Sequence, residues 1–291
     1  MTDITGKAAV VTGGGTGIGM GLAKELARRG VKVVIADIMI DNARRTAAEI
    51  VAAGGQAIAI ACDVCERGAI QAMRTEAEAA FGPIQLLFAN AGATCFDRLE
   101  DMTDDSVDWI VQVNMMGVLN TVRAFLPGMI AAGGGHIVAT SSVAGLMPGS
   151  IPVHCVYAGA KMGIIGLMTN LAMEVERHGI RITTYCPGGV STGMGTRNSS
   201  YRPARFGGPS DAPLQVPEES FQDNHVPFYS PESVAPIVLE AVRRNRPFVF
   251  DHAEQRETFR ETYSRIIEAC FDDIEAWEAE HGTPEVVGAA G

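Results

Sequence analysis

Short apolar runs alternate along the chain with longer segments in which apolar residues recur every three or four positions. This alternation is typical of parallel strands joined by crossover helices. We predict strands at Lys7–Thr12, Val31–Ala36, Gln56–Ala61, Leu86–Ala89, His136–Thr140, Arg181–Tyr185 and Pro247–Phe250. We predict helices at about residues 17–29, 41–53, 66–80, 104–132, 156–178 and 231–245, the fourth broken or kinked at Pro127 and Gly128. Since the strands are short and mostly apolar, helices should cover both faces of an α/β sheet.

Two stretches depart from this rhythm. Residues 193–230 are rich in proline and glycine and too long for an ordinary connector, so we predict a substrate lid. The main domain should then span residues 1–251 and a helical extension residues 252–291. The extension carries an apolar stripe at helical spacing: Phe259, Tyr263, Ile266, Ile267, Cys270, Phe271, Ile274 and Trp277. Such a stripe must be buried, either on its own domain or on a partner subunit.

The charge balance narrows the classes of partner. The formal net charge of −11 repels phosphate backbones and anionic lipid surfaces, so we expect neither nucleic acid nor membrane as a partner. No apolar run approaches the length of a bilayer span, and the N-terminus lacks the basic-then-apolar layout of a signal peptide. With 47% hydrophobic and 20% charged residues the composition is that of a globular chain, and we expect it to be cytoplasmic.

The six cysteines are scattered, which fits reduced thiols better than a disulfide framework. Cys62 and Cys65 form a C-x-x-C pair, so a metal or redox role has to be weighed. Zinc needs four ligands, and the sequence offers neither a second pair nor a histidine at ligand spacing. We therefore predict no metal site.

A glycine-rich turn lies between the first strand and the first helix. Here backbone N–H groups and the helix dipole can hold a pyrophosphate. A glycine-rich turn alone is weak evidence, but its strand–turn–helix context favours a Rossmann-type dinucleotide site. The predicted contacts are Gly13, Gly15, Thr16, Gly17, Ile18 and Gly19.

Asp37 at the end of the second strand can accept hydrogen bonds from the adenosine ribose, although a plain polar cap is the alternative. Its charge repels the 2′-phosphate of NADP, and no arginine or lysine lies in the glycine loop, so we predict NAD. Small or polar residues follow two further strands where a dinucleotide would lie. They are Asp63, Val64, Asn90, Ala91 and Gly92.

Tyr157 and Lys161 are four positions apart on one helical face. A phenol with a pKa near ~10 is a poor base at neutral pH, but a neighbouring ammonium and a positive nicotinamide lower that pKa. Tyr157 is therefore the predicted general acid/base, with Lys161 tuning it and binding the nicotinamide ribose. A hydroxyl of Ser141 or Ser142 can hold the substrate oxygen. Asn114, disfavoured in mid-helix, suits a buried polar role such as holding a water near Lys161.

Taken together, these landmarks resemble the short-chain dehydrogenase/reductase family, in its short single-domain branch, over about residues 5–250. The ordered motifs are Thr12-Gly13-x-x-x-Gly17-Ile18-Gly19, Asp37, Asp63-Val64, Asn90-Ala91-Gly92, Asn114, Ser142-x-x-Gly145, Tyr157-x-x-x-Lys161 and Pro187-Gly188-x-Val190-x-Thr192.

The resemblance implies a catalytic tetrad of Asn114, Ser142, Tyr157 and Lys161, and it favours Ser142 over Ser141 because Gly145 follows at the family's spacing. The residues implied to cradle the nicotinamide are Pro187, Gly188, Val190 and Thr192. The family also implies a seven-stranded parallel sheet, a small-molecule alcohol or ketone substrate, and a homodimer or homotetramer built partly on the helices that carry Asn114 and Tyr157.

The spacing from Ser142 to Tyr157 is slightly longer than usual and contains Pro148 and Pro152, which puts the shape of the substrate pocket in doubt. The tail, the run Asp108-Trp109-Ile110 and the lid run Tyr201-Arg202-Pro203-Ala204-Arg205-Phe206-Gly207 are similar, more loosely, to a sub-branch containing the bacterial Cα-dehydrogenases of lignin-type aryl ethers. This similarity implies a bulky benzylic or other aromatic secondary alcohol.

Two other functions are compatible with the scaffold. A catalytically silent NAD-binding regulator or scaffold protein would have no chemical reason to keep all four tetrad groups. An epimerase or dehydratase would need chain for a separate sugar-nucleotide lobe. Five residues near the site stay open, as pocket wall or as loop packing: His154, Cys155, Met194, Phe206 and Phe228.

Overall fold

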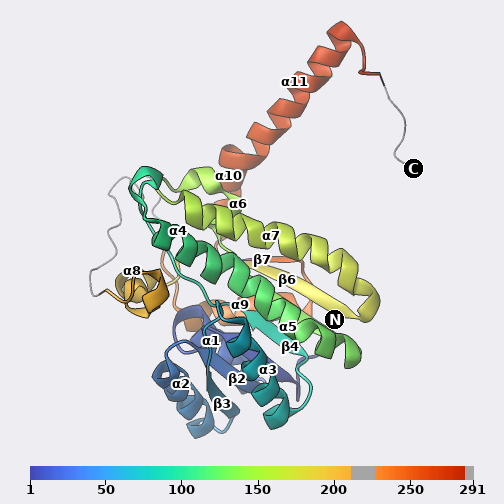
Figure 1. Ribbon diagram of the computed structural model, residues 1–291. Helices are drawn as coiled ribbons and strands as arrows, with labels where there is room; N and C mark the ends of the chain where they lie inside the picture. Colours follow the sequence, from blue (N-terminus) through green and yellow to red (C-terminus); the bar gives the residue numbers. More distant parts are fainter. Residues whose placement is uncertain (211–226, 286–291) are drawn as a thin grey trace.

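The computed structural model describes residues 1–210 and 227–285, with the side chains of residues 196 and 197 left out. Its described residues form a seven-stranded, all-parallel sheet in the order β3-β2-β1-β4-β5-β6-β7 (Figure 1). The strands are β1 Ala8–Thr12, β2 Lys32–Asp37, β3 Gln56–Ala61, β4 Leu86–Ala89, β5 Gly135–Thr140, β6 Ile180–Cys186 and β7 Phe248–Phe250. The chain winds outward from β1 to β3 and then resumes at β4 on the other side of β1. This doubly wound order confirms the predicted fold and creates a crevice at the carboxyl ends of β1 and β4.

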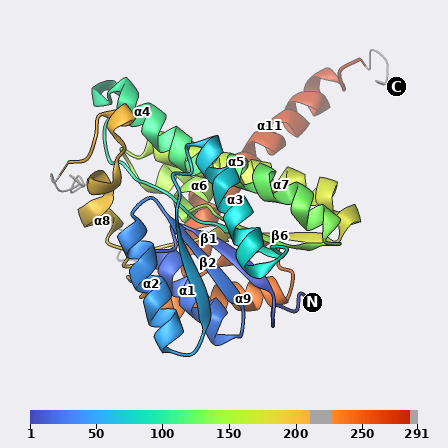
Figure 2. The same cartoon turned by 60° about the horizontal axis from the view of Figure 1, so that its bottom comes forward.

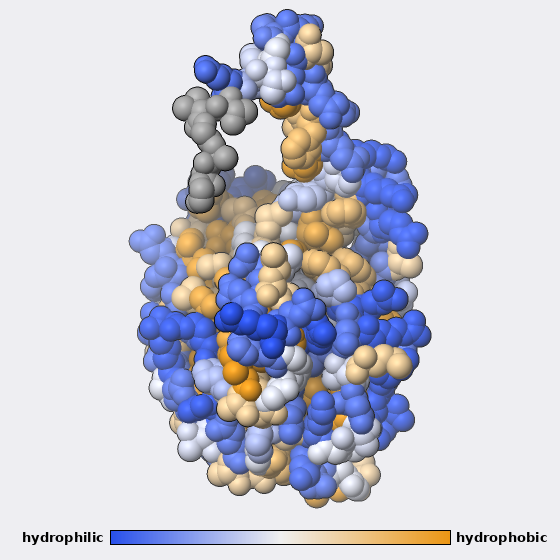
Figure 3. Space-filling model, turned by 90° about the vertical axis from the view of Figure 1, so that its right-hand side faces the viewer, coloured by the Kyte–Doolittle hydropathy of each residue, from blue (hydrophilic) through white to orange (hydrophobic). Residues whose placement is uncertain are grey.

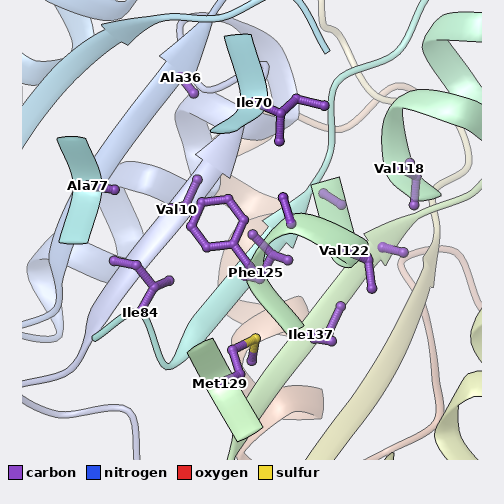
Figure 4. Packing of buried hydrophobic residues seen from close by; sticks show 14 of the residues in the cluster. Val10, Ala36, Ile70, Ala77, Ile84, Val118, Val122, Phe125, Met129 and Ile137 are labelled. Carbon is purple, nitrogen blue, oxygen red and sulfur yellow. The ribbon is translucent and has the colours of Figure 1, made fainter. Parts of the chain in front are cut away.

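Helices cover both faces of the sheet, because successive strand residues point to opposite sides. Val11 packs with α1 and α2 on one face, whereas Val10 packs with α3 and α5 on the other (Figures 2 and 4). The helices are α1 Gly17–Arg28, α2 Ile40–Ala52, α3 Arg67–Phe81, α4 Asp104–Val111, α5 Gly117–Ala131, α6 Val143–Leu146, α7 Cys155–Val175, α8 Met194–Arg197, α9 Pro231–Arg243, α10 Gln255–Phe259 and α11 Arg265–His281.

The long helix predicted over residues 104–132 is interrupted, but not where the sequence indicated. Pro127 lies inside α5, which continues to Ala131. The irregularity is a π-helical turn at Gln112–Met116, which separates α4 from α5 and carries the buried Asn114. Such turns widen a helix locally and are frequent at functional sites.

The expectation about apolar runs also needs correction. By length and composition alone, the helix over Cys155–His178 passes the test for a membrane span, although only 33% of its apolar window is buried. This segment packs against β6 and α6 and carries the buried side chain of Lys161. Those contacts are typical of a core helix in a globular fold.

The predicted lid, residues 193–230, is described only in part, because residues 211–226 lie outside the described residues. Its first part contains α8 and two short 3-10 helices, Asn198–Tyr201 and Ala204–Phe206. Its last part returns to the body through a parallel bridge between Val190 and Tyr229.

The C-terminal extension leaves the body as α10, a π-helical turn at Arg260–Ser264, and α11, which projects away from the sheet (Figures 1 and 3). Phe259 packs on the body, but apolar residues farther along are 44–67% exposed: Ile266, Ile267, Phe271, Ile274 and Trp277. The prediction that the stripe packs on its own domain is therefore wrong for α11. The alternative, that it packs on a partner subunit, stays a prediction. Residues 286–291 of the predicted extension lie outside the described residues.

Candidate active site

A cavity opens at the carboxyl edge of the sheet and joins the glycine loop to the predicted chemical groups. The predicted site residues that line it are Gly13, Thr16, Gly17, Ile18, Asp37, Asp63, Val64, Asn90, Ala91, Gly92, Ser142, Tyr157, Lys161, Pro187, Gly188, Val190 and Thr192. Gly15, Gly19 and Asn114 do not line the cavity. The sequence did not single out Ala93, Val113, Asn198 and several other lining residues, while Trp109, Tyr201 and Pro203 entered only through the looser resemblance.

The glycine loop is packed so closely that side chains are excluded. A Cβ on Gly19 would lie 2.2 Å from the carbonyl oxygen of Gly13, and one on Gly17 would lie 2.9 Å from Cβ of Thr192. The N-terminus of α1 has neither an acidic residue in its first turn nor a capping hydrogen bond from the Thr16 side chain. Its N–H groups and dipole therefore suit a pyrophosphate.

Asn90 ties three strands together beneath this loop. Its side-chain amide donates to the Thr12 carbonyl at 3.1 Å, its amide oxygen accepts from the Thr140 hydroxyl at 3.0 Å, and its backbone N–H donates to the Thr12 hydroxyl at 3.0 Å. The bonds hold the ends of β1, β4 and β5 at fixed separations. Asn90 thus shapes the crevice as well as lining it.

Asp37 is 8% exposed at the end of β2. Its carboxylate accepts from the backbone N–H of Gly15 at 3.0 Å and of Met39 at 2.9 Å. Burial raises the pKa of this carboxyl, while the two hydrogen bonds and the nearby Arg45 act in the opposite direction. Each oxygen keeps a lone pair that a ribose hydroxyl can use.

Arg45 corrects one step of the sequence argument. No basic residue lies in the glycine loop, but Arg45 on α2 reaches it from outside and donates to the Gly15 carbonyl at 3.3 Å. A cation is therefore placed at the same corner as Asp37. The sequence hid this contact because Arg45 lies 30 residues from Gly15.

The C-x-x-C pair has the properties of buried packing. Burial raises the pKa of both thiols, Cys62 and Cys65, to about 12, so both are neutral at physiological pH. The described residues contain no group of three or more histidine, cysteine, aspartate or glutamate side chains suited to a metal ion. Between the two cysteines, Asp63 accepts from the lid residue Arg205 at 2.6 Å, which ties this strand end to the lid.

Tyr157 and Lys161 meet on one face of α7, as their spacing predicts. The Lys161 ammonium lies 5.6 Å from the centre of the Tyr157 ring and donates to the Thr140 carbonyl at 2.9 Å. Burial raises the pKa of Tyr157 to about 12, although a hydrogen bond with Ser142 lowers it, and burial lowers the pKa of Lys161 to about 7. The expected depression of the tyrosine pKa is thus opposed by desolvation, which outweighs it in this structure.

The two serines are distinguished by their partners. Ser141 donates to the Lys161 carbonyl at 2.7 Å and serves to hold α7 against β5. Ser142 caps α6 by accepting from the Ala144 N–H at 3.1 Å, lines the cavity, and is close enough to Tyr157 to lower its pKa. The geometry therefore supports the choice of Ser142.

Asn114 lies directly behind the cavity wall and is fully buried. Its amide donates to the carbonyls of Ala93 at 2.9 Å and Ile110 at 2.8 Å, and its oxygen accepts from the Ala93 N–H at 3.3 Å. A Cβ on Gly92 would lie 2.9 Å from the Asn114 oxygen and 3.3 Å from the Lys161 nitrogen. Asn114 and Lys161 therefore approach each other across Gly92, and the water between them stays a prediction.

A buried network around Asp251 was missed from the sequence. Its carboxylate accepts from the Tyr185 hydroxyl at 2.6 Å and from the Gly188 N–H at 2.9 Å, and contacts His252 Nδ1 at 2.6 Å. The other ring nitrogen of His252 pairs with the Pro227 carbonyl at 2.8 Å. The network fixes the loop that contains Gly188 to the returning end of the lid.

The five open residues divide clearly. Met194 lines the cavity, Phe206 is 9% exposed and packs in the cluster with Trp109 and Tyr157, and Phe228 is 68% exposed. Cys155 is exposed and does not line the cavity. His154 is buried behind Tyr157, outside the cavity wall.

Known proteins resemble this chain over most of its length. The family model described as short chain dehydrogenase matches residues 7–202. A C alpha-dehydrogenase of Sphingobium sp. strain SYK-6 is 32% identical over 271 residues, covering 92% of this chain and 88% of that protein. Putative oxidoreductase SadH of Mycobacterium tuberculosis is 32% identical over 248 residues, covering 84% and 86% respectively.

Solved structures give the same picture. A short chain dehydrogenase/reductase from Burkholderia phymatum in complex with NAD has a TM-score of 0.82 at 29% identity and covers 92% of this chain and 97% of that chain. The apo form of LigD from Sphingobium sp. strain SYK-6 has a TM-score of 0.74 at 29% identity, with coverage of 91% and 98%.

Proposed function

Because the chain belongs to the short-chain dehydrogenase/reductase family, we propose that it is an NAD-dependent oxidoreductase acting between a secondary alcohol and the corresponding ketone. The observation that carries the proposal is the shared cavity. It brings the glycine loop and Asp37 of one sheet half to the same space as Ser142, Tyr157 and Lys161 of the other.

The residues present fit a nicotinamide dinucleotide. The uncapped N-terminus of α1 suits the pyrophosphate, Asp37 suits the adenosine ribose, and the Pro187–Thr192 loop suits the nicotinamide end. Lys161, with one donor on the Thr140 carbonyl, keeps others for the nicotinamide ribose. When bound, the nicotinamide supplies the acceptor or donor of the hydride.

Proton transfer is the task of Tyr157. In oxidation its phenolate takes the hydroxyl proton of the alcohol as the carbinol hydrogen leaves as hydride; in reduction the phenol returns the proton to the ketone oxygen. Ser142 holds the substrate oxygen by a hydrogen bond, and Asn114 keeps the backbone behind Gly92 in place. A positive charge close to the phenol stabilises the phenolate against the effect of burial.

We propose NAD rather than NADP. The Asp37 carboxylate occupies the end of β2, where it suits two free ribose hydroxyls and repels a phosphate. Arg45 offers a charge of the opposite sign at this corner, but it is exposed and already engaged with Asn42 and Gly15. The buried carboxylate, with its fixed geometry, has the stronger effect on a neighbouring phosphate.

The proposed substrate is a bulky aromatic secondary alcohol. The substrate end of the cavity is lined by large apolar or aromatic side chains, among them Trp109, Val113, Met194, Tyr201 and Pro203. The guanidinium of Arg202 lies 5.3 Å from the Trp109 ring and covers it on the lid side. A relative named C alpha-dehydrogenase is consistent with this class of substrate.

We also propose a homodimer or homotetramer located in the cytoplasm. On the exposed side of α7, Met173 is 77% exposed and a Cβ on Gly159 or Gly166 would meet nothing within 4 Å, so a second copy can approach this helix closely. The projecting stripe of α11 supports the same inference. All six cysteines are free thiols, as expected in a reducing compartment.

The test is an NADH-formation screen over aromatic, steroid, sugar and aliphatic secondary alcohols, with Tyr157→Phe as the decisive variant. Loss of the acid/base should lower kcat by about 10²–10⁴-fold while the Kd for NADH stays unchanged. Tyr263→Phe, in the extension and outside the cavity lining, is the matched control. Unaltered turnover in Tyr157→Phe would rule out the proposed role, and a wild-type protein that binds NADH but turns over no alcohol or ketone would favour the silent regulator.

A further inference from the structure

Three aromatic rings form a continuous stack that ends on Tyr157. The rings of His154 and Tyr157 lie 4.3 Å apart at an interplanar angle of 6°. The other face of His154 stacks on Phe96, also at 4.3 Å, with an angle of 13°. The imidazole is therefore clamped between two parallel rings, one of which belongs to the proposed acid/base.

The edge of the His154 ring is fixed as well as its faces. Its Nε2 pairs with the Thr94 hydroxyl at 2.9 Å. Thr94 is itself held by the lid residue Asn198, whose oxygen accepts from the Thr94 N–H at 2.9 Å and whose amide donates to the Thr94 carbonyl at 2.7 Å. The ring orientation thus depends on a residue 104 positions from Thr94 in the sequence.

Two asparagines hold the segment Ala93–Thr94, to which the His154 ring is bonded. Asn114 pairs with both backbone groups of Ala93, and Asn198 pairs with both backbone groups of Thr94. Each side-chain amide thus bonds to one backbone carbonyl and one backbone N–H of this segment, as the peptide groups of a neighbouring strand would. The segment joins the tetrad residue Asn114 on one side to the lid on the other.

We propose that His154 is a positioning residue for Tyr157: its ring, stacked on the phenol, holds the phenol in one orientation and keeps water from one face of it. The consequence for turnover rests on the proposed function, whereas the effect on Tyr157 itself does not.

The environment of His154 suits a neutral aromatic clamp. Burial lowers its pKa to about 4, so the imidazole carries no charge at physiological pH. Among the described residues, ionisable groups near the Tyr157 ring include the Lys161 ammonium and the Cys95 thiol, whose pKa burial raises to about 12. Removing the clamp would hydrate the phenol and lower its pKa, while loosening the ring would slow proton transfer.

Two substitutions separate the ring from its hydrogen bond. His154→Phe keeps an aromatic ring between Phe96 and Tyr157 but loses the bond to Thr94. His154→Gln keeps a polar group for Thr94 but loses the stack. His154→Ala loses both, and His281→Ala on exposed α11 is the control.

The first readout is the ionisation of Tyr157, followed by phenolate absorbance after a rapid pH jump that precedes unfolding. Subtracting the trace of the matching Tyr157→Phe protein isolates this tyrosine from the other four. His154→Ala and His154→Gln should lower the Tyr157 midpoint by about one pH unit, and His154→Phe should leave it in place. This readout requires no turnover.

The second readout is kinetic. The substrate is an aromatic secondary alcohol that the wild type oxidises. His154→Ala and His154→Gln should lower kcat by about 10 to 100-fold, with the KM for NAD unchanged. The kcat of His154→Phe should stay within about threefold of the wild-type value. An unshifted midpoint in His154→Ala overturns the proposal, as does a His154→Phe protein shifted as far as His154→Ala. If the wild type oxidises nothing, the proposed function fails, and the titration still decides the role of His154.

Discussion

The cavity has one half that we propose to hold the cofactor, the cofactor half, and one that we propose to carry the proton transfer, the catalytic half, and the two are built in different ways. The cofactor half, comprising the glycine loop Gly13–Gly19, Asp37 and Asn90–Gly92, is held by bonds between adjacent strand ends and by glycines packed against backbone. The catalytic half, comprising Ala93–Thr94, Ser142, His154–Lys161 and the lid segment 193–210, is held by side chains from segments far apart in the chain.

This difference has a physical consequence. In the cofactor half, bonds between neighbouring strand ends and close backbone packing fix the contacts, so a substitution acts through sterics or charge at one place. In the catalytic half, the position and pKa of Tyr157 depend on several packed neighbours, so a substitution acts through desolvation and orientation. The following experiments test this contrast, beginning with the largest expected effect.

Gly19→Ala should break the cofactor half by sterics alone. The added methyl would lie 2.2 Å from a backbone oxygen that no side-chain rotation can move. We expect a loss of stability of about 3 kcal/mol, the upper end for overpacking, and at least a tenfold weaker Kd for NADH. Urea unfolding and NADH fluorescence titration measure the two effects.

Gly68→Ala in α3 is the matched control, because its Cβ would meet nothing within 4 Å. A more helix-favouring residue there should stabilise the protein by about 0.5–1 kcal/mol. Equal NADH affinity in Gly19→Ala and wild type would contradict the steric account of the loop.

Asp251→Asn should loosen the loop that joins the two halves. The carboxylate accepts from Tyr185 and from the Gly188 backbone, and an amide can satisfy only one of these donors with its oxygen. We expect about 2–3 kcal/mol of lost stability, since a buried donor is left unpaired. The affinity for NADH should fall as well, because the loosened loop contains Gly188, which lines the cavity.

Thermal unfolding with and without NADH checks this prediction. Asp273→Asn on exposed α11 is the control and should change neither quantity. If Asp251→Asn unfolds like wild type, the network does not support the loop.

Acid should destabilise the catalytic half through His154. Its pKa is about 4 when folded and near ~6.5 when unfolded, so below pH 6.5 the unfolded chain takes up a proton that the folded chain refuses. Its contribution to stability is complete above pH 6.5 and is lost as the pH falls towards 4. We expect about 2 kcal/mol of the loss between pH 7 and pH 4.5 to come from this residue.

The measurement is the free energy of unfolding against pH in wild type and His154→Phe. The variant should have a shallower slope, although buried His136, with a pKa lowered to about 3, keeps part of it. The exposed-residue variant His281→Gln should retain the full slope, and an identical slope in His154→Phe would exclude proton linkage at this residue.

Asp37→Ser should shift coenzyme preference. Without the carboxylate, the repulsion of a 2′-phosphate disappears and the positive charge of Arg45 at this corner is no longer offset. We expect the NADP-to-NAD ratio of kcat/KM to rise about tenfold, equivalent to about 1.4 kcal/mol. Asp41→Asn, an exposed charge on α2, should leave the ratio unchanged; an unshifted ratio in Asp37→Ser would mean that this carboxylate does not select the cofactor.

The fold and the cofactor half were predictable because their signals are local. Strands β3 and β4 lie where the apolar runs placed them, and the glycine loop follows β1 as its spacing required. Tyr157 and Lys161 share a face of α7 because helical spacing alone puts them there. The interruption near Asn114 was misplaced, since proline is the stronger local signal and a π-helical turn has no distinct one.

The rest was decided by packing between distant segments. Nothing near Asp251 in the sequence indicates that its partners would be Tyr185, 66 residues away, and Gly188, 63 away. Likewise, the contact of Arg45 with the glycine loop depends on where α2 lies beside α1.

By itself the sequence determined the architecture, and it predicted a place for a dinucleotide and a set of reacting side chains, because each has a signal in short-range patterns of hydrophobicity, glycine and helical spacing. Only the tertiary structure decided the environment of Tyr157: its desolvation, the proximity of Ser142 and the ring of His154 against its face. A pKa depends on everything within a few ångströms, and which residues come that close is settled only when the chain is folded.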